Sequence, residues 1–169
     1  TEGKKFKYLY MIRMLRLLLL FLVIAIVACP LRSQETTEQK VKSGLECYNQ
    51  LPNYYSKWDS MFMYGEKAYE LLKDSDYKEE ASSSLLYMAM AKDYSGHKKA
   101  CKKYLDLALE YTAQNIGTNN DYYNTGLNIL GAYYQDMGDY SNAQEVYERA
   151  IQNHKQSKAQ DPATLSSFY

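Results

Sequence analysis

The chain is 169 residues long, 46% hydrophobic and contains three prolines, which suits a single domain with a hydrophobic core. No stretch alternates Val or Ile with polar residues, so the composition predicts an all-α fold without a sheet. The first 33 residues hold six Lys and Arg and one Glu, so the remainder carries a net charge of −5, which argues against nucleic acid as a partner.

Residues 1–33 have the features of a bacterial export signal. Residues 17–29 are uncharged and apolar, and two arginines precede them. Because a membrane-spanning helix needs about 20 apolar residues, a cleaved signal peptide is the first interpretation and an uncleaved anchor the second. Residues 1–10 are interpreted as lying upstream of a true start at Met11 or Met14. The remainder is predicted to be exported, in the periplasm or attached to a membrane.

The end of the apolar run contains a cysteine. Ile26, Val27 and Ala28 precede Cys29, and this short pattern resembles a bacterial lipoprotein box. The resemblance implies lipidation of Cys29, which would bring the protein to a membrane. The alternative is an ordinary signal peptide that is cut nearer Ser33.

Residues 34–53 are predicted to be a tether, or a poorly anchored first helix turn, followed by a short helix that ends at Pro52. Residues 54–73 show a clearer pattern, because large apolar and small residues recur at helical spacing and Asp74-Ser75-Asp76 ends the run. This stripe consists of Trp58, Met61, Phe62, Gly65, Tyr69 and Leu72. Within it, Gly65, Tyr69 and Leu72 have the small, aromatic, apolar spacing of a second repeat helix.

Residues 78–113 are predicted to form a helix pair that repeats, in degenerate form, in residues 122–155. The shift is 42 residues, the difference between Leu85 and Leu127. In this register the first pair uses Leu85, Met88, Ala89, Gly96, Cys101, Leu105 and Ala108. A slip of one residue, which would use Ala91, Ala100 and Tyr104, predicts the same two helices and stays open.

Residues 122–155 carry the clearest pattern in the chain. Each helix places its apolar residues on one face, and Gly138 between them can take the left-handed conformation that ends a helix. The repeat-packing residues are Leu127, Leu130, Gly131, Tyr134, Ala143, Tyr147 and Ala150. Their sizes alternate, since the small residues allow two backbones to approach and the tyrosines fill the space beside them.

This arrangement of Leu-Gly and Tyr in one helix, then Ala, Tyr and Ala in the next, resembles the tetratricopeptide repeat. The resemblance implies antiparallel helix pairs stacked as a right-handed solenoid. The closing proline of the repeat would fall at Lys155, whereas the nearest is Pro162, so the unit is expected to be longer than usual. Residues 158–169 are interpreted as the start of a further, truncated repeat.

The resemblance also implies where a partner binds, because the first helix of each tetratricopeptide pair lines the concave face. The residues carried over to that face are Leu86, Met90, Asp93, Tyr94, Asn128, Ala132, Gln135 and Asp136. The family's Lys/Asn clamp for a peptide carboxylate has no counterpart, since Leu86, Asn128, Met90 and Ala132 occupy its places. An acidic C-terminal peptide is therefore not the expected ligand.

No catalytic, metal or cofactor site is predicted. HExxH, CxxC, GxSxG and glycine-rich phosphate motifs are absent from the sequence. Of the two histidines, His97 falls at a turn and His154 near a helix C-terminus, where capping or solvent exposure is expected. Cys47 and Cys101 fall on predicted helices and are interpreted as small buried hydrophobic residues.

These features favour a non-enzymatic scaffold that binds a protein or peptide outside the cytoplasm. The alternative is the extracytoplasmic sensor region of a bacterial membrane signalling protein, with a kinase or DNA-binding output elsewhere. A weaker alternative is a glycan-binding lipoprotein, for which the nineteen tyrosines would supply stacking surfaces.

Overall fold

The computed structural model describes Met11, Met14, Arg16 and residues 36–160, with side chains as far as Gln156. The chain divides after Thr36 into two units, and the helices described below belong to the second. The apolar run 17–29, the candidate lipidation residue Cys29 and residues 161–169 lie outside the described residues.

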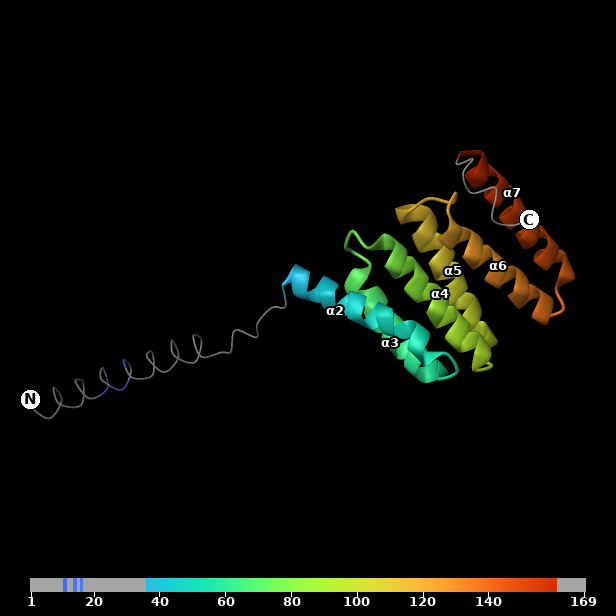
Figure 1. The fold of residues 1–169 in the computed structure, drawn as a ribbon. Helices are drawn as coiled ribbons and strands as arrows, with labels where there is room; N and C mark the ends of the chain where they lie inside the picture. Colours follow the sequence, from blue (N-terminus) through green and yellow to red (C-terminus); the bar gives the residue numbers. More distant parts are fainter. Residues whose placement is uncertain (1–10, 12–13, 15, 17–35, 161–169) are drawn as a thin grey trace, which may run out of the picture. The chain divides into compact units, whose positions relative to one another are not determined.

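The second unit is all-α, and no strand occurs among residues 36–160. Its elements are α2 (Thr37–Gln50), the short 3-10 helix η1 (Leu51–Tyr54), α3 (Trp58–Leu72), α4 (Lys78–Tyr94), α5 (Lys98–Asn115), α6 (Asp121–Asp136) and α7 (Tyr140–Gln160). Short connections turn each helix antiparallel to the one before it (Figure 1). The helices pack in sequence order, and this confirms the predicted all-α fold of stacked helix pairs.

Two turns of the same geometry join α4 to α5 and α6 to α7. Gly96 and Gly138 have φ angles of 78° and 74°, the left-handed region in which glycine avoids a steric penalty. In each turn the glycine N–H donates to the carbonyl three residues earlier, at 2.9 and 3.0 Å. The N–H groups of His97 and Asp139 then donate to the carbonyl five residues earlier, at 2.8 and 2.9 Å. Both helices are thereby ended and reversed within three residues.

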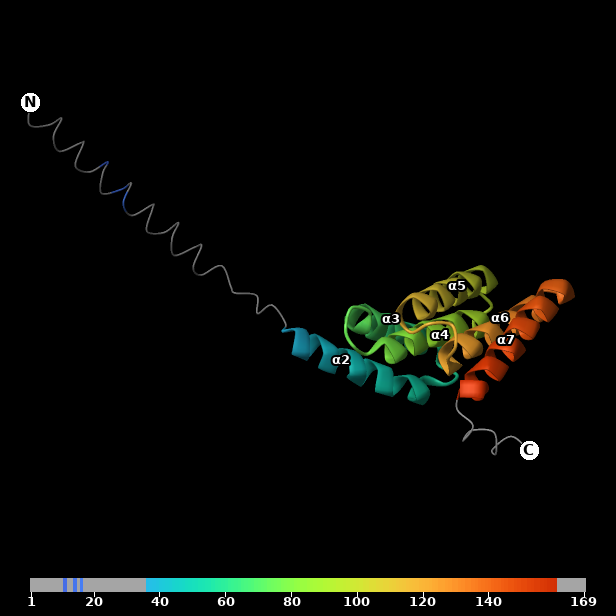
Figure 2. The ribbon, with the colours of Figure 1, turned by 90° about the horizontal axis from the view of Figure 1, so that it is seen from above.

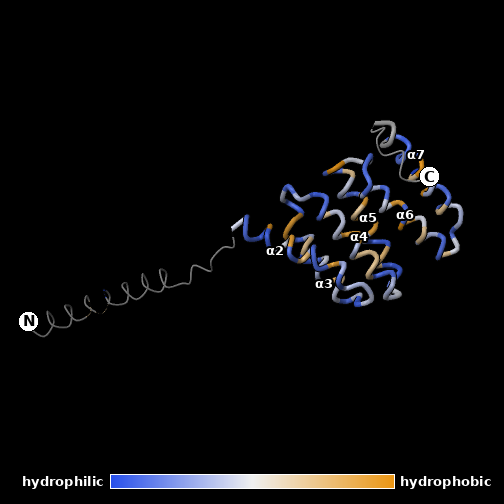
Figure 3. The backbone as a smooth tube through the Cα atoms, in the orientation of Figure 1, coloured by the Kyte–Doolittle hydropathy of each residue, from blue (hydrophilic) through white to orange (hydrophobic). Residues whose placement is uncertain are grey.

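The core lies between the helices, where hydrophobic positions recur along each of them (Figure 3). Leu85, Leu105 and Leu127 are fully buried in it. In the register shifted by 42 residues, all six helical positions of residues 78–113 are buried: Leu85, Met88, Ala89, Cys101, Leu105 and Ala108. In the alternative register, Ala100 and Tyr104 are only half-buried. Burial therefore favours the register shifted by 42 residues from Leu127 to Leu85.

The α6–α7 pair packs through small residues. Leu127, Leu130, Gly131, Ala143 and Ala150 are buried, whereas Tyr134 and Tyr147 are half-buried. A Cβ atom built on Gly131 would lie 2.5 Å from Cε1 of Tyr147. The ring of Tyr147 thus occupies the space that the missing side chain leaves.

The first pair differs from the other two. α2 begins at Thr37, within the segment for which the sequence left open a tether or a first helix turn. α3 begins at Trp58, four residues later than the predicted 54–73 run, because η1 precedes it. The N–H of Met61 donates to the carbonyl of Lys57 at 2.9 Å, as that of Cys101 does to His97. Met61 therefore lies as far from the start of α3 as Cys101 does from the start of α5.

Helices one pair apart also touch. α2 contacts α4 and α4 contacts α6, which places the first helices of the pairs beside one another (Figure 2). Aromatic rings join α3 to α5 in edge-on contacts, with centroids 5.3 Å apart for Phe62 and Tyr104 and 5.5 Å apart for Tyr69 and Tyr111. The last helix, α7, continues through Gln160, beyond the predicted repeat end at residue 155.

Both described cysteines are free and buried, as the sequence predicted. Burial, aided by the nearby Asp93 carboxylate, raises the pKa of the Cys101 thiol to about 12. A thiol with such a pKa is protonated at neutral pH and is a poor nucleophile.

We therefore expect Cys101 to resist iodoacetamide in the folded protein. In a background of Cys29→Ser and Cys47→Ser, the thiolate fraction at neutral pH should be lower than in an exposed thiol by on the order of a thousandfold. Mass spectrometry of the alkylated protein, with and without denaturant, measures the difference. Equal rates in the two conditions would contradict the burial of Cys101.

Candidate binding groove

A groove lies between α4 and α6, because both helices present a stripe of residues at i, i+3 and i+4 to the same side. It holds two adjoining cavities that share Met90 and Ile129. The first, of about 390 Å³, is lined by Pro52, Tyr55, Ser83, Leu86, Tyr87, Met90, Thr125 and Ile129. The second, of about 280 Å³, is lined by Met90, Asp93, Tyr94, Asn128, Ile129, Ala132 and Tyr133.

The segment between α2 and α3 forms one wall of this groove. It contributes Pro52 and Tyr55, and Tyr55 lies edge-on to Trp58 with ring centroids 5.5 Å apart. Trp58 in turn stacks on Tyr94 of α4, at 4.6 Å and an interplanar angle of 15°. These contacts fix three rings beside the two cavities, and Tyr55 and Tyr94 stay more than half exposed, at 62% and 55%. The groove therefore has a rigid aromatic border that a partner can contact.

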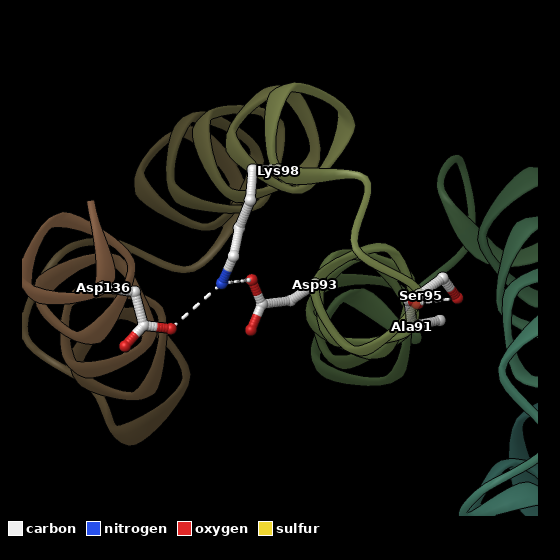
Figure 4. Close-up of polar contacts among 5 residues, drawn as sticks. All are labelled: Ala91, Asp93, Ser95, Lys98 and Asp136. Carbon is white, nitrogen blue, oxygen red and sulfur yellow. Dashed lines mark hydrogen bonds and ion pairs between the residues drawn. The ribbon is translucent and has the colours of Figure 1, made fainter.

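Lys98 pairs with Asp93, which lines the second cavity. Its Nζ lies 2.7 Å from Oδ1 of Asp93 and 3.0 Å from Oδ2 of Asp136, so it joins α4, α5 and α6 (Figure 4). Both carboxylates accept hydrogen bonds from the ammonium group and raise the pKa of Lys98 above its ordinary value. Asp93 and Asp136 thus share one lysine, so this end of the groove has one positive and two negative charges.

The structure brings together six of the eight residues predicted for the concave face. Leu86, Met90, Asp93 and Tyr94 of α4, with Asn128 and Ala132 of α6, line the two cavities. Gln135 and Asp136 do not line them. The side-chain amide oxygen Oε1 of Gln135 accepts a hydrogen bond from the Tyr147 hydroxyl at 3.4 Å, and Asp136 pairs with Lys98.

Sequence reasoning missed seven lining residues, which fall into two classes. Ser83, Tyr87, Thr125, Ile129 and Tyr133 lie one residue or one helical turn from predicted residues of the same stripe. Extending the helical spacing along α4 and α6 would have found them. Pro52 and Tyr55 come from a different segment, and no spacing in the sequence connects them to α4.

Among the described residues no group of three or more His, Cys, Asp and Glu side chains is placed to hold a metal ion. Within the same part of the chain, none of the helices combines the length and the apolar character needed to cross a membrane. His97, at the N-terminal cap of α5, is exposed.

No protein-family model, curated protein or solved structure matches this chain.

Proposed function

We propose that the protein is a non-enzymatic scaffold that binds a protein or peptide segment in the groove between α4 and α6. The observation that carries the proposal is that the residues expected on a ligand-binding face line two adjoining cavities with an exposed aromatic border. On the sequence of residues 1–33, we propose that it acts outside the cytoplasm, in the periplasm or at a bacterial membrane.

We further propose that the helix pairs are tetratricopeptide repeats. The turns at Gly96 and Gly138 support this, since they have the same φ angles and hydrogen bonds. Buried residues at equivalent positions of the α4–α5 and α6–α7 pairs support it as well, with Cys101 in the place of Ala143 and Ala108 in that of Ala150.

The chemistry of the groove favours an extended segment with two neighbouring apolar side chains. Leu86, Met90 and Ile129 supply apolar surface at the junction of the cavities, and each cavity is the size of one or two side chains. Ser83, Thr125 and Asn128 lie along the cavity edges and offer hydrogen-bonding groups to a peptide main chain. Because Asp93 and Asp136 share Lys98, a net negative charge remains at this end and an anionic ligand is disfavoured here.

We expect peptides selected from a random displayed library on the wild-type protein to lose at least about tenfold in affinity on Met90→Arg, because Met90 lines both cavities. Fluorescence anisotropy with the selected peptides measures the change. Met63→Arg is the matched control, since Met63 is 56% exposed and lies on α3 outside the groove.

Peptides that bind the wild type and Met90→Arg equally well would show that the groove is not the binding surface. The proposal would also be contradicted if none of the selected peptides lost affinity on either Met90→Arg or Met63→Arg.

A further inference from the structure

The two cavities of the groove differ in charge. Every residue that lines the first cavity is uncharged, whereas Asp93 of α4 lines the second. The second cavity also contains two tyrosines, Tyr94 of α4 and Tyr133 of α6. A peptide lying along the groove therefore meets a carboxylate and aromatic rings in the second cavity and a neutral surface in the first.

The carboxylates at the second cavity outnumber the cation that pairs with them. Lys98 of α5 lies between Asp93 of α4 and Asp136 of α6, with its Nζ 2.7 Å and 3.0 Å from their oxygens (Figure 4). The two carboxylate side chains are 26% and 57% exposed, so solvent and ligands reach both of them. One negative charge is left over, and it attracts a second cation.

Neighbouring lysines are directed to other partners. Lys92 precedes Asp93 in the chain, but its Nζ lies 3.6 Å from the centroid of the Phe62 ring on α3. Lys102 lies one turn after Lys98 on α5, and its Nζ pairs with Oδ1 of Asp106 at 2.6 Å. These lysines thus have partners outside the groove, and the surplus charge is available to a ligand.

The tyrosines of the second cavity favour the same kind of ligand. Trp58 stacks on one face of the Tyr94 ring, and Tyr94 still remains 55% exposed. Tyr133 precedes Asp136 by three residues and lies on the same side of α6. A cationic side chain gains from the face of a tyrosine ring as well as from a carboxylate, so the two attractions add at this place.

A strained turn holds the aromatic wall in position. Ser56 lies between Tyr55 and Trp58 and has a φ of 78°, the left-handed angle that Gly96 and Gly138 adopt at the other two turns. A residue with a side chain pays a conformational cost for this angle, and such strain is concentrated at binding and active sites. The turn keeps the Trp58 ring against Tyr94, which lines the second cavity.

We propose that the second cavity selects a lysine or arginine side chain of a partner peptide. The aliphatic stem of that side chain contacts Met90 and Ala132, while its charged end lies beside Asp93 and Tyr94. An apolar residue next to it in the peptide occupies the first cavity. The assignment rests on the proposed function, and it narrows one of the two apolar side chains expected there to the stem of a basic residue.

Charge complementarity also bears on whether the chain's own ends supply the basic side chain. Residues 161–169 contain one Asp and neither Lys nor Arg, so they do not match the pocket. Residues 1–33 contain six Lys and Arg and belong to the first of the two units. Their basic residues are therefore changed in one arm of the test.

The probes are peptides selected from a random displayed library on the wild-type full chain, with affinities measured by fluorescence anisotropy. We expect the selected peptides to be enriched in Lys or Arg next to an apolar residue. Replacement of that basic residue by norleucine keeps an aliphatic side chain and removes the charge. This replacement should lower the affinity by at least about fivefold.

Two protein variants should change the affinity in opposite directions. Asp136→Asn removes a carboxylate that does not line the cavities and should weaken binding by about two- to fivefold. Lys98→Gln removes the competing cation and should strengthen binding by a similar factor. Asp106→Asn is the matched control, since this carboxylate is 56% exposed, pairs with Lys102 and lines neither cavity, and it should leave the affinity unchanged.

Both Asp136→Asn and Lys98→Gln break the same ion pair, so a purely structural role of that pair would lower the affinity in both variants and would overturn the assignment. Peptides that depend on Met90 but bind equally well with norleucine would also overturn it and leave the groove as the binding surface. Peptides that are insensitive to Met90→Arg would instead contradict the groove itself. A rise in peptide affinity when the six basic residues of 1–33 are changed to Gln would assign the pocket to the chain's own segment rather than to a partner.

Discussion

Ala143→Arg is expected to unfold the α6–α7 pair. Ala143 is 4% exposed and lies in the first turn of α7, on the face that packs against α6. A guanidinium group at this position would be placed among the buried residues between α6 and α7, which leave it no room. We expect a loss of about 3 kcal/mol or more in the free energy of unfolding, measured by urea denaturation with far-UV circular dichroism.

The loss should be confined to the end of the stack, because each helix pair depends mainly on its neighbours. The helical content should therefore fall by the fraction that α6 and α7 contribute, while α2 to α5 stay folded. Gln144→Arg is the matched control, since it makes the same change at the next residue, which is exposed. If Ala143→Arg and Gln144→Arg unfold at the same urea concentration, the assigned packing face of α7 is wrong.

Leu105→Ala is expected to destabilise the middle of the protein. Leu105 is fully buried on α5 and belongs to the core that the helices share. Truncation removes apolar contacts and leaves a cavity, which together cost about 2–5 kcal/mol in the free energy of unfolding. Because α5 packs against both α4 and α6, the whole transition should shift to lower urea rather than split in two.

Ile151→Ala provides the comparison for this variant. It deletes a similar aliphatic side chain from a residue that is 54% exposed in the free protein. We expect a change of about 0.5 kcal/mol or less. A cost for Ile151→Ala as large as that for Leu105→Ala would mean that Ile151 is buried in solution.

Signals between residues close together in the sequence were sufficient to predict the helices and turns of the α4–α5 and α6–α7 pairs. Gly96 and Gly138 marked the reversals, and the apolar spacing around Leu85 and Leu127 marked the buried faces. These features depend on residues close together in the chain, where backbone preference and helical spacing act directly.

Features that depend on distant residues were not predictable in this way. Tyr55 reaches the groove only because η1 displaces the start of α3, and Lys98 meets Asp136 only because α5 and α6 lie side by side. The length of α7 is by contrast a local feature, since no glycine or proline interrupts the chain before Pro162, and the unit was expected to be longer than usual. Most of the candidate groove could therefore be predicted along α4 and α6, but neither its aromatic wall nor its ion pair could.

The packing of each helix against its neighbours in sequence has a kinetic consequence. Nearly all stabilising contacts join segments that are close along the chain, so little loop entropy is lost before a contact forms. Folding can begin at any one of the pairs and spread outward, and a pulling force applied to one end would detach helix pairs in succession. Such a topology lets each pair assemble without waiting for distant parts of the chain.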